Sequence, residues 1–171
     1  MQRHEDPAPV VSLRPARPDD LPALFQIQSD PESNEMAGTR PRAPESFYAV
    51  WDQQLNNPAL RGCVIELEGA AGREVVGSIA CFQAPDDEGV TRDCVGYWIA
   101  RSHWGRGIAS RALALFLAVE TRRPLHATAA RCNAPSCRIL EKCGFRCTGF
   151  RMGEETDRYL ARELAEFVLV Q

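Results

Sequence analysis

The sequence has no apolar run approaching the roughly 18 residues or more that a membrane-spanning helix needs. Residues 1–9 are polar and carry two prolines, unlike a secretory signal, so we expect a cytoplasmic protein with no membrane partner. Lysine is almost missing, since Lys142 is the single one, and the formal net charge is -3. A chain of this charge lacks a broad basic face, and we expect no nucleic-acid partner.

The cysteines form neither a metal-binding pattern nor a disulfide pattern. Seven is an odd number in a chain long enough to fold without cross-links, so reduced thiols are expected. The four that cluster in the sequence contain no Cys-x-x-Cys pair. The three histidines are scattered, and none is spaced with an acid or a cysteine as in a nucleophilic site. The sequence therefore predicts no metal.

The length of 171 residues suits one domain, and no repeat, linker or low-complexity tract divides it. We expect a flexible tail at 1–9 and a single domain at 10–171. Segment 30–44 has three prolines, a glycine and no periodicity, which predicts a long and therefore functional loop. Strands are predicted at 10–14, 63–67, 75–82, 92–100, 125–130, 146–152 and 164–170, and helices at 18–29, 45–55, 108–123 and 134–143.

The predicted strand at 92–100 leads through a polar turn into Gly105-Arg106-Gly107 and then into an apolar periodic helix. The glycines let the backbone approach a ligand closely, and the first turn of the helix has N–H groups without partners. A phosphate group is the expected ligand of this strand, loop and helix.

Two common phosphate-binding loops fit the segment poorly. A kinase-type P-loop ends in Gly-Lys-Ser/Thr, and residues 105–110 contain no lysine. The dinucleotide fingerprint has glycine directly after the strand and an acid about 20 residues later. Here four residues separate Ala100 from Gly105, Ser110 holds the third glycine position, and residues 125–131 contain no acid. The first loop is excluded, and the second is a weak match.

A third pattern is found in two blocks. The loop Trp104-Gly105-Arg106-Gly107-Ile108-Ala109 resembles the acetyl-CoA loop of the GNAT superfamily of N-acetyltransferases, in its RimJ/RimL-like branch. The segment 133–145, Asn-Ala-Pro-Ser-Cys-Arg-Ile-Leu-Glu-Lys-Cys-Gly-Phe, resembles the Asn-x-x-Ser-x-x-x-x-Glu-Lys-x-Gly-Phe block of that family. The order of the predicted elements also resembles that of the family over nearly the whole chain.

The resemblance implies an α/β (α+β) fold of the GNAT type. Its mixed, mostly antiparallel sheet of six to seven strands is flanked by four helices, and its parallel central strands, ending near Ala100 and Ala130, splay apart. Acetyl-CoA is the implied co-substrate. The cofactor-binding residues implied are Trp98, Ile99, Ala100, Trp104, Gly105, Arg106, Gly107, Ile108, Ala109, Ser110, Asn133 and Ser136.

The catalytic residues are predicted less directly. The tyrosine with which many family members protonate the leaving thiol corresponds to Leu140, which cannot donate a proton. Ser136 is therefore nominated as the thiol-side donor. A glutamate that often serves as base in this branch corresponds to Cys94, so Asp93 is the nominated base, although alternation along the strand turns it to the other face.

The predicted function is acetyl-CoA-dependent transfer of an acetyl group to a primary amine. A protein amino terminus is favoured as acceptor over a small amine or antibiotic because of the branch that the chain resembles. Acids of the long loop, Asp30, Glu32 and Glu35, are candidates to line the amine pocket. The alternatives are a catalytically silent CoA-binding or regulatory module and a zinc-held interaction domain. We expect a monomer or a homodimer.

Overall fold

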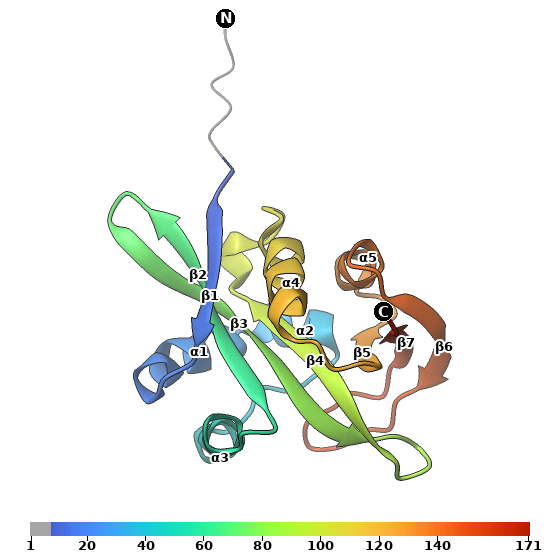
Figure 1. Ribbon diagram of the computed structural model, residues 1–171. Coiled ribbons are helices and arrows are strands. Elements are labelled where there is room, and N and C mark those ends of the chain that lie inside the picture. Colours follow the sequence, from blue (N-terminus) through green and yellow to red (C-terminus); the bar gives the residue numbers. More distant parts are fainter. Residues whose placement is uncertain (1–7) are drawn as a thin grey trace, which may run out of the picture.

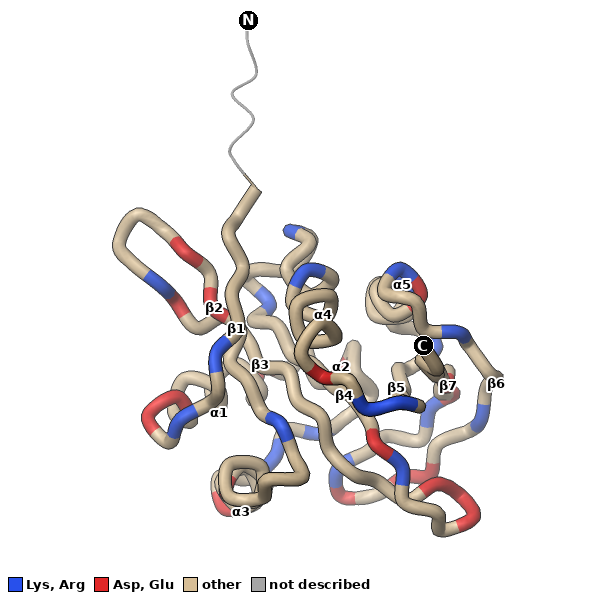
Figure 2. Tube along the Cα trace, viewed as in Figure 1, with Lys and Arg blue, Asp and Glu red and all other residues tan. Residues whose placement is uncertain are grey.

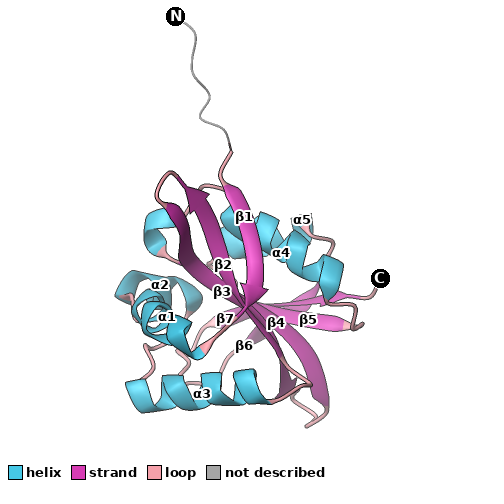
Figure 3. Cartoon of the chain, turned by 60° about the vertical axis from the view of Figure 1, so that its left-hand side comes forward, coloured by secondary structure: helices cyan, strands magenta, loops and turns pink. Residues whose placement is uncertain are grey.

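A computed structural model describes residues 8–171, which form one seven-stranded sheet with helices on both faces (Figures 1 and 3). Most of the tail expected at 1–9 lies outside the described residues. The strands are β1 (Val10–Pro15), β2 (Arg61–Gly69), β3 (Gly72–Pro85), β4 (Thr91–Ile99), β5 (Leu125–Ala130), β6 (Arg146–Met152) and β7 (Glu163–Leu169). The helices are α1 (Leu21–Gln28), α2 (Pro31–Ala37), α3 (Pro44–Asn56), α4 (Ile108–Val119) and α5 (Ala134–Lys142).

The sheet separates two apolar clusters because successive side chains of a strand point to opposite faces. On β2, Val64 packs in the cluster that includes Leu24 of α1 and Phe47 of α3. Its neighbour Ile65 lies in the larger cluster with Phe116 of α4. All five side chains are at most 1% exposed, and each contributes about 1.5–3 kcal/mol by leaving water. Figure 3 shows α1, α2 and α3 on one face of the sheet and α4 and α5 on the other.

The expected loop at 30–44 is wrong in its first half, because α2 lies there and raises the number of α-helices from four to five. Asp30 accepts a hydrogen bond from the Ser33 amide (2.8 Å), and Pro31 stands at the first helical position. Gly38, in the left-handed region at φ +71°, ends the helix. Asn34 in its middle is only 1% exposed and donates to the Gln28 and Asp30 carbonyls.

The strand order is β1-β2-β3-β4-β5-β7-β6, and every neighbouring pair is antiparallel except β4 and β5. The parallel pair is joined through α4, as a parallel connection requires. Strands β4 and β5 pair at a single position, Cys94 with His126, and beyond this pair the two strands diverge. The expected mixed sheet with splayed central strands is confirmed.

Charged positions of both signs are interspersed along the trace, apart from the acidic turn between β3 and β4 (Figure 2). Helix α4 ends at Val119, before the predicted end at 123. The next residue, Glu120, is 3% exposed and is bound by Arg122 and Arg61. This ion cluster around the buried Glu120 carboxylate, rather than Pro124, follows the last residue of the helix.

Candidate active site

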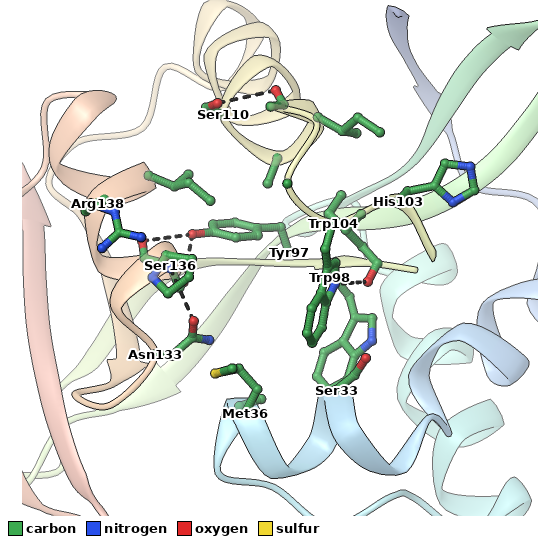
Figure 4. Close-up of a pocket in the computed structure, with 18 of the residues that line it drawn as sticks. Ser33, Met36, Tyr97, Trp98, His103, Trp104, Ser110, Asn133, Ser136 and Arg138 are labelled. Atoms are coloured by element: carbon green, nitrogen blue, oxygen red, sulfur yellow. Dashed lines mark hydrogen bonds between the residues drawn. The ribbon is translucent and has the colours of Figure 1, made fainter. Parts of the chain in front are cut away.

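A cleft of about 620 Å³ opens where β4 diverges from β5, between α2, the start of α4 and α5 (Figure 4). Its wall is mainly apolar, with polar groups concentrated at the glycine loop and at the start of α5. Of the residues predicted to bind the cofactor, those that line the cleft are Trp98, Ile99, Trp104, Gly105, Gly107, Ile108, Ala109, Ser110, Asn133 and Ser136. The fold thus brings both sequence blocks to one place.

The glycine loop forms one end of the cleft. Gly105 and Gly107 adopt left-handed φ values of +73° and +71°, and a Cβ at Gly105 would meet no atom within 4 Å. Gly107 directly precedes α4 and has no side chain to cap it, so the first-turn N–H groups stay available. The Ser110 hydroxyl lies 3.3 Å from the Gly107 carbonyl oxygen. The free amides of the first turn of α4, the dipole of that helix and the open space at Gly105 together suit a phosphate group.

Two cations on α5 line the same cleft and were missed from the sequence. Arg138 and Lys142 lie four residues apart, which puts them on one face of that helix. Arg106, predicted for this role, is exposed and does not line the cleft. The spacing of four on the predicted helix was the signal that could have found the pair.

The cleft edge of β4 is open to an extended ligand. Beyond Cys94 this edge has no strand partner on the β5 side within the described chain. The indole N–H of Trp104 donates to the Ile99 carbonyl (3.0 Å), which fixes the loop against the strand. Ala100 was also predicted here, but its N–H donates to the Val76 carbonyl (2.8 Å), and the residue does not line the cleft. An extended chain can therefore pair along the last residues of β4.

A pair of hydroxyl groups lies across the cleft from the glycine loop. The Tyr97 hydroxyl is 2.9 Å from Ser136 Oγ, where either oxygen can be the donor, and 3.3 Å from the Ser136 carbonyl oxygen, which is its other possible acceptor. Asn133 caps α5 by accepting a hydrogen bond from the Ser136 amide (3.3 Å). Burial raises the pKa of Tyr97 to about 12, so the phenol is neutral at ordinary pH. The sequence placed Tyr97 on the strand but gave no signal that it meets Ser136.

No aspartate or glutamate lines the cleft among the residues that the structure describes. Helix α2 contributes Ser33, Met36 and Ala37 to the wall, whereas the acids of this segment bind arginines. Those ion pairs are Asp30 and Glu32 with Arg101, and Glu35 with Arg162. The cleft therefore offers hydroxyls, amides and cations, but no carboxylate base.

The structure places Asp93 away from the cleft, near the β3–β4 turn. Its carboxylate lies 3.5 Å from Arg122 and accepts a hydrogen bond from Gln83 (3.4 Å). It lines a separate hollow with Val90 and His126. This geometry does not bring Asp93 to the residues of the glycine loop or to Ser136.

Comparison with known proteins identifies the family. Residues 11–146 match the family model of the acetyltransferase (GNAT) domain. The chain belongs to the GNAT family. The resemblance expected from its two sequence blocks is confirmed, and with it the fold and an acyltransferase that uses acetyl-CoA.

Individual relatives agree with this assignment. The "Uncharacterized N-acetyltransferase p20" of Bacillus licheniformis is 28% identical over 153 residues, which are 81% of this chain and 80% of p20. Mycobacterium smegmatis RimJ, solved in complex with CoA-disulfide, is 27% identical with a TM-score of 0.70, covering 96% of this chain and 83% of RimJ. Vibrio cholerae spermidine N-acetyltransferase, in complex with CoA and spermine, shares the fold at 17% identity and a TM-score of 0.72, covering 94% and 95%.

The residues present fit the co-substrate. The uncapped amides after Gly107 with Arg138 and Lys142 suit phosphates, and the open edge of β4 suits an extended arm. Within 8–171 no three His, Cys, Asp or Glu side chains gather in a group that could hold a metal ion. No helix of that part of the chain is long and apolar enough to cross a membrane.

Proposed function

We propose that this acetyltransferase transfers the acetyl group of acetyl-CoA directly to a primary amine, and that the α-amine of a protein amino terminus is the favoured acceptor over a small amine. The observation that carries this proposal is a cleft with phosphate-binding amides at one end, a Tyr97–Ser136 hydroxyl pair at the other, and no carboxylate in its described lining. The similarity to RimJ, which was solved with a CoA ligand, supports it.

In this proposal the glycine loop binds the diphosphate of CoA through the amides of Gly107, Ile108, Ala109 and Ser110. The pantetheine arm extends along the open edge of β4 beside Trp98 and Ile99, and a strand N–H polarises the thioester carbonyl. Asn133 fixes the start of α5 and thereby the place of Ser136. These contacts would hold the thioester where the two central strands part.

The hydroxyl pair would act on the leaving sulfur. Either hydroxyl can be the donor in this contact; in the proposed arrangement Tyr97 donates to Ser136 Oγ, and the serine hydroxyl hydrogen then points at the developing thiolate. A thiol has a reference pKa of about 8.5, so its thiolate is a fair leaving group and needs stabilisation more than a strong acid. We assign Ser136 as the hydrogen-bond donor and Tyr97 as the residue that orients it.

The missing carboxylate favours an α-amine. Roughly 10–20% of an α-amino group is neutral at pH 7, against less than about 0.1% of a lysine side chain. An α-amine therefore attacks without a dedicated base, and catalysis depends on holding it near the thioester. Asp93 is not assigned the role of base, because it lies outside the cleft and next to Arg122.

Release of free thiol from acetyl-CoA tests the proposal. The acceptors are short peptides with a free amino terminus, the same peptides with a blocked terminus and one lysine, and a polyamine. We expect thiol release with the free-terminus peptides that is at least tenfold faster than with the other two classes. Tight CoA binding without release for any amine would contradict the proposal and favour a silent CoA-binding module.

A further inference from the structure

Two segments far apart in the sequence meet beside α2. They are the α2–α3 linker (residues 38–43) and the β6–β7 linker (residues 153–162). Thr39 pairs with Tyr159, and the Arg40 amide donates to the Arg158 carbonyl (2.7 Å). The Leu160 amide donates to the Gly38 carbonyl (3.0 Å). This pairing gives the region a fixed backbone.

The two linkers and the residues packed beside α2 are rich in arginine, and three of these arginines have carboxylate partners. Each of these cations is neutralised by an acid at salt-bridge distance, so they form solvent-facing ion pairs that need no ligand. The pairs are Arg40 with Glu155, Arg101 with Asp30 and Glu32, and Arg162 with Glu35.

Arg158 and Arg42 differ, because neither has a carboxylate partner among residues 8–171. Arg158 donates to the Asn34 side-chain oxygen (3.3 Å) and to the Arg40 carbonyl, while its Nε is buried without a partner. Arg42 is half-buried and makes no hydrogen bond or ion pair within the described part of the chain. Burial, and next the like charge of Arg42, lower the pKa of Arg158 to about 10.

Such an arrangement is unfavourable on its own. A charged group taken from water without a counter-ion loses hydration that two neutral hydrogen-bond acceptors do not replace, and a second cation beside it adds repulsion. An anion placed between the two guanidinium groups would reverse both effects. Each guanidinium offers a planar fork of N–H donors that matches a carboxylate.

Arg158 lies next to the cleft. The guanidinium carbon of Arg158 lies 5.9 Å from the centre of the Trp98 ring, and Trp98 lines the cleft. Asn34, which holds Arg158, belongs to α2, and the neighbouring Ser33 of that helix also lines the cleft. Figure 4 shows α2 and Trp98 on the same side of the opening. An acceptor that places its amine in the cleft and an anionic group beyond Trp98 would therefore bring that group toward Arg158.

We propose that the acceptor is an amine that also carries an anionic group, a carboxylate in the simplest case, and that Arg158 and Arg42 bind this group. The inference rests on the transfer reaction proposed above and names its substrate class. Two sources share this chemistry: a free amino acid with its own carboxylate, and a peptide whose amino terminus is followed by aspartate or glutamate. The same two cations repel a polyamine, so a polycationic acceptor is disfavoured.

The test compares matched acceptors in the thiol-release assay. One arm uses amino-terminal peptides with Asp or Glu at the second and third positions against the same peptides with Asn or Gln. The other arm uses free amino acids against their carboxamides. Loss of one charge-assisted contact reduces kcat/KM by about 10- to 150-fold. If the acceptor is a peptide, the acidic peptides should be preferred at least tenfold over their Asn or Gln counterparts. If it is a free amino acid, the amino acids should be preferred at least tenfold over their carboxamides.

Arg42→Gln should remove most of that preference by lowering kcat/KM for the anionic acceptor toward the value for its neutral counterpart. Its side chain has no partner in the described chain, so the variant is expected to fold. Arg158→Gln should do the same, with its melting temperature measured because Arg158 also holds the two linkers together. Arg73→Gln is the matched control, since Arg73 is an exposed arginine of the β2–β3 hairpin.

Equal or faster transfer to neutral and cationic acceptors by the wild-type protein would overturn the proposal and leave the transfer reaction standing. A preference that survives unchanged in Arg42→Gln and in folded Arg158→Gln would overturn it as well. No thiol release with any amine would overturn the proposed reaction, and the acceptor assignment with it.

Discussion

The Tyr97–Ser136 hydroxyl pair makes a prediction about the chemistry at sulfur. Tyr97→Phe keeps the half-buried ring and removes only the oxygen that lies 2.9 Å from Ser136 Oγ. Ser136→Ala removes the other hydroxyl and keeps the Asn133 cap, because that cap uses the Ser136 backbone amide. The double variant completes a cycle that separates a joint role from two independent ones.

The expected magnitudes follow from the pKa values of the groups. Burial raises the pKa of Tyr97 to about 12, and a free thiol lies near 8.5, so moving the Tyr97 proton to the thiolate is uphill by roughly 3.5 units, or about 5 kcal/mol. The pair therefore stabilises the developing charge as a donor without giving up a proton. A hydrogen bond to a charged group contributes about 1.5–3 kcal/mol, a loss of about 10- to 150-fold in kcat for Ser136→Ala.

Tyr97→Phe removes a bond between neutral hydroxyls, which contributes about 0.5–1.5 kcal/mol, so kcat should fall about 2- to 13-fold. The assay is thiol release at saturating acetyl-CoA, with CoA affinity measured by calorimetry. The double variant should match Ser136→Ala within about twofold, since Tyr97 acts through Ser136. Full kcat in Tyr97→Phe, or losses that multiply in the double variant, would refute this reasoning.

Three further variants test the loop, the sheet and the buried ion cluster. Gly107→Ala puts a side chain at φ +71°, so the free energy of unfolding in urea should fall by about 1–2 kcal/mol. The affinity for CoA, measured by calorimetry, should fall as well. Gly77→Ala would place its Cβ 2.1 Å from the Trp98 carbonyl oxygen, and urea unfolding should show a loss of about 2–3 kcal/mol. Hydrogen bonds from Arg122 are the chief cause that lowers the pKa of Glu120 from 4.5 to about 2. The ionised Glu120 therefore stabilises the folded protein fully above about pH 4.5, and this contribution disappears as the pH falls toward 2. Glu120→Gln should therefore cost about 2–3 kcal/mol at pH 7 and almost nothing at pH 2, and an equal cost at both pH values would contradict that linkage.

Much of the scaffold could be predicted because local patterns and tertiary structure agree. Alternating apolar residues specified the β2–β3–β4 meander, and the glycine loop followed by periodic apolar residues specified α4. Helix α2 was missed although its signals, Asp30 and Pro31 at the start and Gly38 at the end, are in the sequence. The helix has no apolar stripe to reveal it. It is held by Asn34, whose buried hydrogen bonds come from its tertiary surroundings.

The site shows the same division between local and long-range information. The glycine loop and Asn133 owe their conformations to neighbouring residues, so motif spacing predicted that they lie at the cleft. The Tyr97–Ser136 pair joins residues 39 positions apart, and Arg158 reaches Asn34 over 124 positions. The periodicity of apolar residues along the sequence cannot predict contacts between side chains so far apart in the chain. Asp93 was nominated by its nearness in sequence to a family position, whereas its place on β4 directs it to Arg122.

Diffraction from crystals soaked with CoA would locate the co-substrate directly. We expect the diphosphate on the amides of residues 107–110 and the sulfur beside the Ser136 hydroxyl, with the pantetheine arm along the free edge of β4. Density for CoA elsewhere on the molecule, or a diphosphate bound away from the glycine loop, would contradict the account.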